Sequence, residues 1–264
     1  MNQLIIVKIG GNIVDDEEAL QHFLKNFAAI QQAKILVHGG GKLATRMAET
    51  MGIHQQMIDG RRITDAETLK IVTMVYAGYI NKQIVAQLQQ YSSNAIGLTG
   101  ADANSILAHK RKGNTDQSID YGFVGDIDQI DAAFFNGLIQ QSYLPVVAPI
   151  THDGEGQLLN TNADTVAQSI ATAMSRFYET ILVYSFEKKG VLLDINNEDS
   201  VIPVINAEYY QTLKLNQQIF AGMIPKLDNA FAAIEQGVSK VIIGNADELA
   251  ELIIGKAGTT IQHG

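Results

Sequence analysis

Short apolar stretches alternate with longer amphipathic ones along the chain. The apolar stretches are rich in Ile, Val and Leu, a pattern typical of buried parallel strands. It predicts strands at Leu4–Ile9, Lys34–Val37, Ala95–Leu98, Leu144–Ala148, Thr180–Tyr184 and Lys240–Ile243.

Between these strands, apolar residues recur with the spacing of one helix face. The predicted helices are Glu17–Ala29, Leu43–Met51, Ala66–Leu88, Asp131–Gln140, Thr165–Met174, Pro225–Ile234 and Ala246–Ile254. This alternation indicates an α/β fold with a mainly parallel sheet, helices on both faces and the strand-to-helix loops on one rim.

Two features modify this regular pattern. The stretch from Asn104 to Asp128 is less regular, and we expect a hairpin or a flap over a site there. A soft boundary is expected near Arg176, where a second series of strands and helices begins.

Composition narrows the class of protein. The 264 residues are 46% hydrophobic and 18% charged, which is ordinary for a globular protein. A net charge of -9 argues against nucleic acid as a partner. There is no cysteine, no signal-peptide pattern and no apolar run long enough to cross a membrane, so a cytoplasmic location is expected.

The first predicted strand carries a lysine, Lys8, in an otherwise apolar run that ends in Gly10 and Gly11. Open α/β sheets bind ligands at the carboxyl ends of their strands, and a buried charge is costly unless an anion meets it. Lys8 and the backbone N–H groups of the two glycines therefore suggest a phosphate clamp. An edge-strand lysine that extends to water is the alternative.

Three consecutive glycines, Gly39, Gly40 and Gly41, join another predicted strand to the next helix. Glycine permits close backbone approach, and a helix N-terminus favours an anion. The loop suits a carboxylate or a phosphate, whereas a plain flexible turn is the alternative. The P-loop, dinucleotide-binding and protein-kinase motifs are absent from the sequence.

Arg61 and Arg62 precede an expected helix cap at Thr64 or Asp65. An arginine fork suits a carboxylate, although a solvated pair is the simpler interpretation of these two residues alone.

Asn160 and Asn162 share a face if their segment is extended, and Asp164 is either a helix cap or a site carboxylate. Lys226 follows Pro225 in a first helical turn, where the helix dipole disfavours a cation. It therefore needs an anionic partner, either Asp164 or a phosphate. The histidines show no metal-ligand spacing, so no metal site is assigned.

In this order, these residues resemble the amino acid kinase family over nearly the whole chain. The resemblance rests on Lys8–Gly11, His38–Gly41, Gly60–Thr64, Asn81–Lys82, Gly97–Asp102, Tyr143–Val147, Asn160–Asp164, Gly222–Lys226 and Gly258–Ile261.

The resemblance implies a three-layer αβα sandwich and an enzyme that phosphorylates the γ-carboxylate of an N-acylglutamate with ATP, as in arginine biosynthesis. It implies ATP with Mg²⁺, the metal being bound mainly through the phosphates. It places acylglutamate binding and dimerisation in residues 1–176 and ATP binding in residues 177–264.

Site roles follow from the same resemblance. It makes Lys8, Lys226 and Asp164 catalytic, the lysines flanking the transferred phosphoryl group and the aspartate orienting them. It assigns the substrate to Gly40, Gly41, Arg62, Asn160 and Asn162, and the phosphates or nucleotide to Gly10, Gly11 and Ser185.

One departure from the family pattern concerns the nucleotide. Phe186 stands where many members have Asp, in a loop one residue longer, so the usual ribose or adenine contact is in question.

Alternatives stay open at this point. The acyl group is acetyl or a longer one such as succinyl. Another amino acid kinase, acting on glutamate, aspartate, carbamate or UMP, is the rival enzyme, and a non-catalytic amino-acid or nucleotide sensor is the rival from another class.

We expect a homodimer that L-arginine does not inhibit. Arginine-inhibited members of the family carry an extra N-terminal helix, whereas the first strand here begins by Gln3 or Leu4. The expected dimer interface uses apolar positions of the helix Ala66–Leu88, namely Ile71, Met74, Val75 and Ile80, unless these are core.

Overall fold

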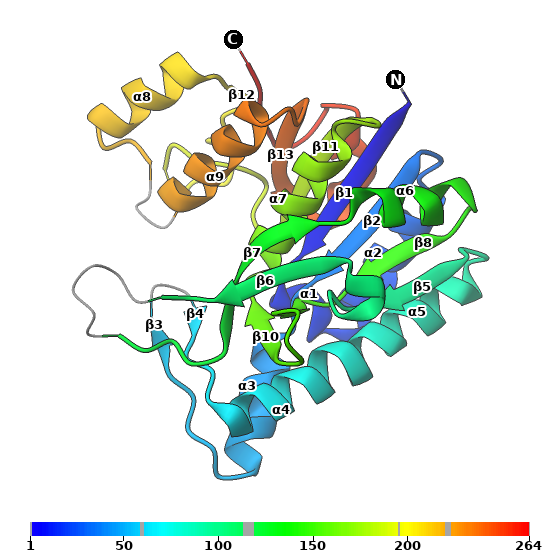
Figure 1. Cartoon of the computed structure of the whole chain (residues 1–264). Coiled ribbons are helices and arrows are strands. Elements are labelled where there is room, and N and C mark those ends of the chain that lie inside the picture. The colour runs from blue at the N-terminus through cyan, green and yellow to red at the C-terminus, as the bar shows by residue number, and fades with distance from the viewer. Residues whose placement is uncertain (1, 59–60, 113–118, 195, 220–222, 264) are drawn as a thin grey trace.

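The computed structural model describes residues 2–58, 61–112, 119–194, 196–219 and 223–263. An eight-stranded sheet forms its centre, in the order β12-β14-β13-β11-β1-β2-β8-β5 (Figure 1). Among the described strands of this sheet, only β13 and β14 pair antiparallel. The strands are β1 (Gln3–Ile9), β2 (Ala33–His38), β5 (Ala95–Leu98), β8 (Leu144–Val147), β11 (Glu179–Phe186), β12 (Val204–Ile205), β13 (Lys240–Asn245) and β14 (Thr259–Ile261).

The six strands predicted from the apolar runs all lie in this sheet, so that prediction is confirmed. Their apolar residues are needed because helices cover both faces, and Leu4 to Val7 of β1 have no exposed surface. The two strands that the pattern missed, β12 and β14, are only two and three residues long.

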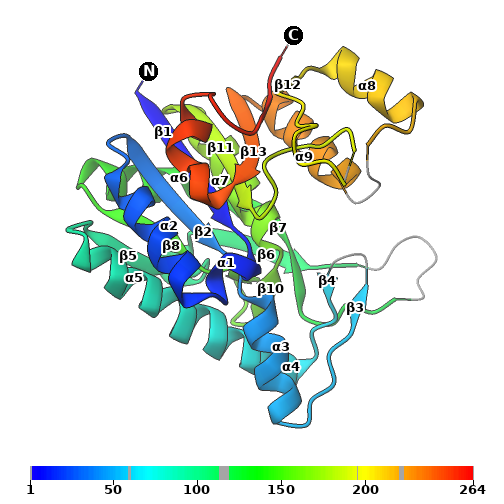
Figure 2. The same ribbon diagram turned by 180° about the vertical axis from the view of Figure 1, so that it is seen from behind.

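Helices form the outer two layers, which confirms the predicted three-layer sandwich (Figures 1 and 2). One face is covered by α2 (Glu17–Ala29), α5 (Asn81–Gln90) and α10 (Leu249–Ile253). The other face is covered by α6 (Ala132–Gln140), α7 (Ala163–Met174), α8 (Ala207–Leu215) and α9 (Ile224–Glu235). Near the carboxyl ends of β1 and β2 lie α1 (Gly11–Val14), α3 (Gly41–Thr50) and α4 (Ala66–Thr73).

The helix predicted at Ala66–Leu88 is continuous but not uniform. Between α4 and α5, Met74–Ile80 form a π-helical segment, η1. Three of the four positions proposed for a dimer interface, Ile71, Val75 and Ile80, belong to the core, and only Met74 is exposed. The interface prediction is therefore wrong for those three residues. Their helical spacing could not distinguish the two uses, because both need an apolar face.

A second, smaller sheet lies beside the carboxyl ends of the main strands. It joins β6 (Ile106–Lys110), β7 (Val124–Ile130), β9 (Ile150–His152) and β10 (Leu158–Thr161) in a closed ring, and a separate hairpin pairs β3 (Met57–Ile58) with β4 (Arg61–Arg62). The antiparallel pair β6 and β7 confirms the hairpin expected between Asn104 and Asp128.

The main sheet runs unbroken across the boundary expected near Arg176. The strand that follows it, β11, pairs with β1 from Gln3↔Glu179 to Ile9↔Ser185. The chain thus leaves β1 toward β2 on one side and returns to its other side as β11. Ligands of open α/β sheets bind at such a reversal of strand order.

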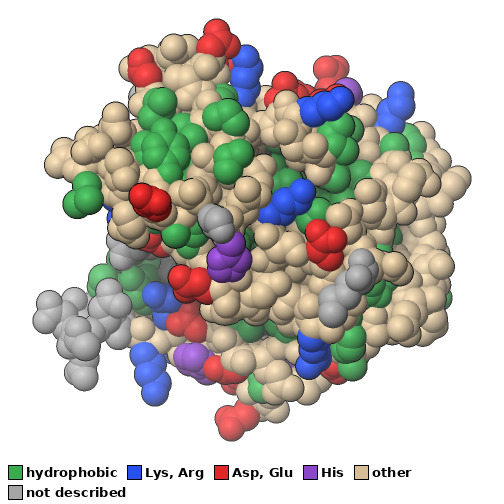
Figure 3. All heavy atoms as spheres, turned by 90° about the horizontal axis from the view of Figure 1, so that it is seen from above, with side chains coloured by type: hydrophobic (Ala, Val, Ile, Leu, Met, Phe, Trp, Pro, Cys, Tyr) green, Lys and Arg blue, Asp and Glu red, His purple; other side chains and the backbone are tan. Residues whose placement is uncertain are grey.

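No helix among the described residues has the length and apolar character needed to cross a membrane. In the face drawn in Figure 3, the lysine and arginine side chains of described residues are scattered among acidic ones and form no continuous basic area.

Candidate active site

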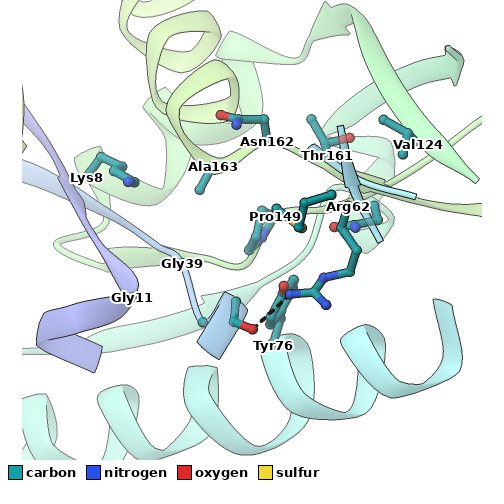
Figure 4. Close-up of a pocket in the computed structure, with 14 residues that line it drawn as sticks. Lys8, Gly11, Gly39, Arg62, Tyr76, Val124, Pro149, Thr161, Asn162 and Ala163 are labelled. Carbon is teal, nitrogen blue, oxygen red and sulfur yellow. Dashed lines mark hydrogen bonds between the residues drawn. The ribbon is translucent and has the colours of Figure 1, made fainter. Parts of the chain in front are cut away.

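A pocket opens at the carboxyl ends of β1 and β2, beside the strand-order reversal. Its walls come from β1, both glycine loops, the β3–β4 hairpin, η1 and the junction of β10 with α7. Lys8 lies on one side and Arg62 on the other, with Asn162 and Pro149 between them (Figure 4). The sequence placed Lys8 and Arg62 in separate motifs, and the fold brings them into one pocket.

Two lysines share one carboxylate at this site. The Nζ atom of Lys8 lies 2.8 Å from Oδ1 of Asp164. The Nζ atom of Lys226 lies 3.7 Å from Oδ2 of the same residue. Lys8 stands on a central strand between β11 and β2, so the interpretation of an edge-strand lysine is wrong. The pairing with an anion, expected for both lysines, is confirmed.

The N-cap of α7 explains why Asp164 is free to bind lysines. The side chain of Asn162 accepts hydrogen bonds from the backbone N–H groups of Asp164 and Thr165, at 2.8 and 3.2 Å. The helix therefore begins earlier than predicted, and the expectation that Asp164 is its cap is wrong. Because Asn162 caps the helix, the carboxylate of Asp164 is left in the first turn for the two ammonium groups.

The charge state of Asp164 depends on these neighbours. Burial raises the pKa of its carboxyl, but the ammonium groups of Lys8 and Lys226 outweigh that effect, and the net pKa lies below the ordinary value of 3.8. Asp164 is therefore ionised at neutral pH and can accept hydrogen bonds from both lysines.

Aromatic rings hold Lys226 from the other side. Its Nζ atom lies 5.7 Å from the ring centre of Tyr184 and 5.6 Å from that of Phe186. The Tyr184 hydroxyl donates to the backbone oxygen of Asp164 at 3.4 Å, and burial and the Asp164 charge raise its pKa, so it stays protonated. Phe186, the departure from the family pattern, thus contacts Lys226 by a cation–π interaction.

The two glycine loops lie against each other. A Cβ atom on Gly39 would lie 3.5 Å from the nitrogen of Gly11, and one on Gly11 would lie 3.8 Å from the nitrogen of Gly41. Gly10 and Gly40 are the N-caps of α1 and α3, whose first N–H groups have no partner within their helices. The loops therefore bring two helix N-termini together, an arrangement that favours an anion.

Arg62 is a buried cation held by neutral groups, with 7% of its surface exposed. One terminal nitrogen donates to the backbone oxygen of Gly41 and to Oγ1 of Thr45, both at 2.9 Å, and the other donates to Gln55. Among the described residues it forms no ion pair. A buried guanidinium without a carboxylate partner is suited to an anionic ligand.

Both predicted asparagines line the pocket. Asn160, on β10, donates from Nδ2 to the hydroxyl of Thr64 at 3.0 Å. The Oδ1 atom of Asn162 is used in capping α7, so the Nδ2 group remains for a ligand. Asp65 caps α4 by accepting from Thr68 at 2.7 Å, as expected.

Gly10, Asp164 and Lys226 are not part of the pocket lining itself, although Asp164 and Lys226 form the charge cluster with Lys8. Ser185 is also absent from that lining. It is only 1% exposed, and its hydroxyl has no hydrogen-bond partner within the described part of the chain. Its contact with nucleotide stays a prediction. Gly222, at the start of the Lys226 motif, and Gly60, before Arg61, lie outside the described residues.

Sequence reasoning missed much of the pocket wall. The residues not predicted there are Met57, Tyr76, Val124, Pro149, Thr161 and Ala163. Thr161 and Ala163 lie inside the Asn160–Asp164 motif, which assigns them no role. No local motif marks the other four, whose apolar character predicts core equally well. The described residues contain no cluster of three or more His, Cys, Asp or Glu side chains that could hold a metal ion.

Comparison with known proteins assigns the chain to a family. Residues 3–245 match the model of the amino acid kinase family. The chain is 58% identical to the acetylglutamate kinase of Cytophaga hutchinsonii, over 96% of this chain and 95% of that one. It is 53% identical to the acetylglutamate kinase of Phocaeicola vulgatus, over 98% of both. The chain belongs to the amino acid kinase family.

Solved structures share the fold of this amino acid kinase family member at low identity. An N-acetylglutamate synthase from Neisseria gonorrhoeae superimposes with a TM-score of 0.83 and 21% identity, covering 99% of this chain and 59% of that one. The carbamate kinase of Giardia gives a TM-score of 0.71 and 12% identity, covering 100% and 99%.

The ion pairs of Asp164 predict a pH-dependent stability difference. Because the folded-state pKa is lowered, the charged carboxylate stabilises the fold above pH 3.8, and this contribution is lost as the pH falls through the folded pKa. The variant Asp164→Asn should be less stable than wild type at pH 7, by up to about 3 kcal/mol. Urea unfolding at pH 3 to 7 should show the gap narrowing toward the acid end. A constant gap would contradict the charge assignment.

The rings beside Lys226 predict an effect of Phe186→Leu on catalysis. Loss of a cation–π contact worth about 0.5–2 kcal/mol should lower kcat several-fold by loosening Lys226. The control Phe186→Tyr keeps a ring and should retain most of the wild-type kcat. Steady-state kinetics with both variants would contradict this role if leucine and tyrosine behaved alike.

Proposed function

We propose that the chain catalyses ATP-dependent phosphorylation of the γ-carboxylate of N-acetyl-L-glutamate, a step of arginine biosynthesis. The observation that carries this proposal is the Lys8–Asp164–Lys226 cluster beside two glycine loops, because its Lys8 lines the same pocket as a buried arginine. The acetylglutamate kinases that are more than half identical to the chain support the choice of substrate.

The proposed reaction needs little chemistry from the protein. The γ-carboxylate of the substrate attacks the γ-phosphorus of ATP, the bond to the β–γ bridging oxygen breaks, and an acyl phosphate and ADP result. A carboxylate at neutral pH is already a nucleophile and needs no general base. Catalysis then consists of positioning and of neutralising the charge on the transferred phosphoryl group.

The cluster supplies both contributions. Two lysines and one aspartate leave a net charge of +1, which attracts the phosphoryl group from either side. Asp164 keeps the lysines at fixed positions, and the N–H groups at Gly11 and Gly41 are proposed to bind phosphoryl and carboxylate oxygens. Gly10 and Gly40 precede these two residues as the N-caps of α1 and α3.

Substrate binding is assigned to the opposite side of the pocket. Arg62 has no carboxylate partner in the described part of the chain, so we assign to it the α-carboxylate of the acylglutamate. The amides of Asn160 and Asn162 are proposed to bind the acylamide group. These residues lie within 1–176, and we propose that 177–264, with Ser185, bind ATP.

Magnesium is proposed to accompany ATP. The described residues form no metal cluster of their own, and the free polar groups of the site are cationic or N–H donors, so a metal held mainly by the nucleotide phosphates fits this donor set. When bound, it would neutralise part of the phosphate charge.

A coupled assay of ATP turnover tests the function. N-acetylglutamate should be phosphorylated faster than glutamate, aspartate, carbamate or UMP, and N-succinylglutamate should be included to decide the acyl group. No turnover with any acylglutamate would favour a sensor and overturn the proposed function.

We further propose a cytoplasmic homodimer. ATP is consumed mainly in the cytoplasm, which supports the location. Met74 and Tyr79 of η1, which are 56% and 61% exposed, are large apolar side chains that a partner subunit would cover. Light scattering measures the assembly state.

Lys8→Met should strongly reduce turnover. The variant keeps the length of the side chain and removes the charge that contacts the developing transition state, and such a loss costs about 10²–10³ in kcat. The KM for N-acetylglutamate should change far less. The control Lys34→Met removes a lysine at the amino end of β2, away from the pocket at the carboxyl ends of the strands, and should leave kcat unchanged. Near-normal kcat in folded Lys8→Met would contradict the catalytic assignment.

Arg62→Lys should impair acylglutamate binding. It keeps a positive charge but loses the forked donors, so the KM for N-acetylglutamate should rise by a factor of about ten or more. The KM for ATP should stay near its wild-type value. Equal increases in both constants would show that Arg62 does not belong to the amino-acid side of the pocket.

A further inference from the structure

His38, the last residue of β2, is fully buried and makes two hydrogen bonds. Its Nδ1 atom lies 2.8 Å from the backbone oxygen of Gly39. Its Nε2 atom lies 3.2 Å from Nδ2 of Asn81, the first residue of α5. The ring therefore connects the glycine loop of the proposed kinase site to the helix behind it.

The partners define the protonation state of this ring. The oxygen of Gly39 can only accept, so Nδ1 carries the proton, whereas the amide nitrogen of Asn81 can only donate, so Nε2 is bare. Burial lowers the pKa of His38 to about 4, which agrees with a neutral ring. A second proton on Nε2 would face the Asn81 donor.

Asn81 is itself held in one orientation. Its Nδ2 group also donates to the backbone oxygen of Val146 at 3.0 Å, and its Oδ1 accepts from Lys82 at 3.1 Å. Gly97 allows this approach, because a Cβ atom there would overlap Oδ1 of Asn81. The amide of Asn81 therefore cannot turn without losing partners on both sides.

The π-helical segment η1 ends directly before Asn81. Its last residue, Ile80, packs against Gly40, where a Cβ atom would overlap the Ile80 side chain. Gly40 also has a φ of 153°, a conformation that favours glycine. The extra residue of a π-turn changes which side chains face the neighbouring loop, and such turns recur at functional sites.

The hydrogen bond from His38 to the oxygen of Gly39 determines where the N–H group of Gly40 points. The peptide between Gly39 and Gly40 is planar and trans, so its C=O and N–H point in opposite directions. With the oxygen of Gly39 bound by the buried ring, the N–H of Gly40 is directed away from His38, and Gly40 lines the pocket. We propose that His38 and Asn81 are positioning residues that hold this N–H toward the reacting carboxylate or phosphoryl group.

This inference rests on the proposed function and adds a residue pair to it. A structural role alone would change stability without changing turnover. A positioning role requires that turnover follow one particular hydrogen bond, the one from Nδ1 to Gly39.

Two amide substitutions separate the two ring nitrogens. In His38→Asn, the side-chain amide occupies the place of Nδ1 and can still donate to Gly39. In His38→Gln, it reaches the place of Nε2 and keeps only the link to Asn81. We expect kcat of the glutamine variant to fall by about 10², because a misplacement of a binding group by about 1 Å can cost that factor. The asparagine variant should retain at least about tenfold more activity than the glutamine variant, and the KM for ATP should change little in either.

Tyr178→Phe is the matched control, because it removes the hydrogen bond of 2.8 Å from Tyr178 to Asn136, outside the pocket. It should lower stability and leave kcat unchanged. Nitrogen-15 NMR of the wild type should show a neutral His38 ring with the proton on Nδ1 between pH 5 and 8, whether or not any variant folds. A proton on Nε2 would overturn the inference.

The kinetic outcomes are distinct. Equal kcat values for the asparagine and glutamine variants, with an active wild type, would overturn the positioning role alone. An inactive wild type would overturn the proposed function, and with it this inference.

Discussion

Two ammonium groups and one carboxylate share a small, partly buried volume, and the site depends on their balance. Lys8 and Lys226 have side chains that are 15% and 32% exposed, so each loses part of its hydration. Without Asp164, two partly desolvated cations would repel each other. With it, the repulsion is offset, and the cluster still carries one positive charge for an incoming anion.

The sheet makes this balance possible. Lys8 comes from the central strand β1, Asp164 from the first turn of α7, and Lys226 from the first turn of α9. Both helices pack on the same face of the sheet (Figure 1). The cap at Asn162 is the local device that frees Asp164, and the rings of Tyr184 and Phe186 hold Lys226 where a helix dipole alone would disfavour it.

Across the pocket, the glycine loops add backbone polar groups to the side chains of Arg62, Asn160 and Asn162. The loops after β1 and β2 lie in contact because glycine leaves room for it, and their helix N-termini face the same space. In the loop after β2, Arg62 donates a hydrogen bond to the backbone oxygen of Gly41, and His38 donates one to the backbone oxygen of Gly39. Both bonds fix the loop by its carbonyl groups and leave N–H groups for a ligand.

Phe186 shows that a departure from a family pattern can make a contact that the sequence does not indicate. The missing Asp raised a question about ribose or adenine contacts, which the loop pattern could not answer. The structure places the ring against Lys226, so the substitution affects one lysine of the charge cluster. No local signal indicated this, because the two residues are forty positions apart in the sequence.

The sequence by itself determined six of the eight strands of the main sheet, most of the helices that cover it and the ordered motifs around Lys8, the glycine loops, Asp164 and Lys226, but not β12, β14 or α8. These follow from periodicity and from residue types, which act over a few positions. Only the tertiary structure decided that Asn162 caps α7 in place of Asp164 and that Ile71, Val75 and Ile80 are core. It also decided that His38 reaches Asn81 and that Tyr76 lines the pocket. Such pairings depend on which elements become neighbours, and that is settled by packing across the whole sheet, not by the local pattern of the chain.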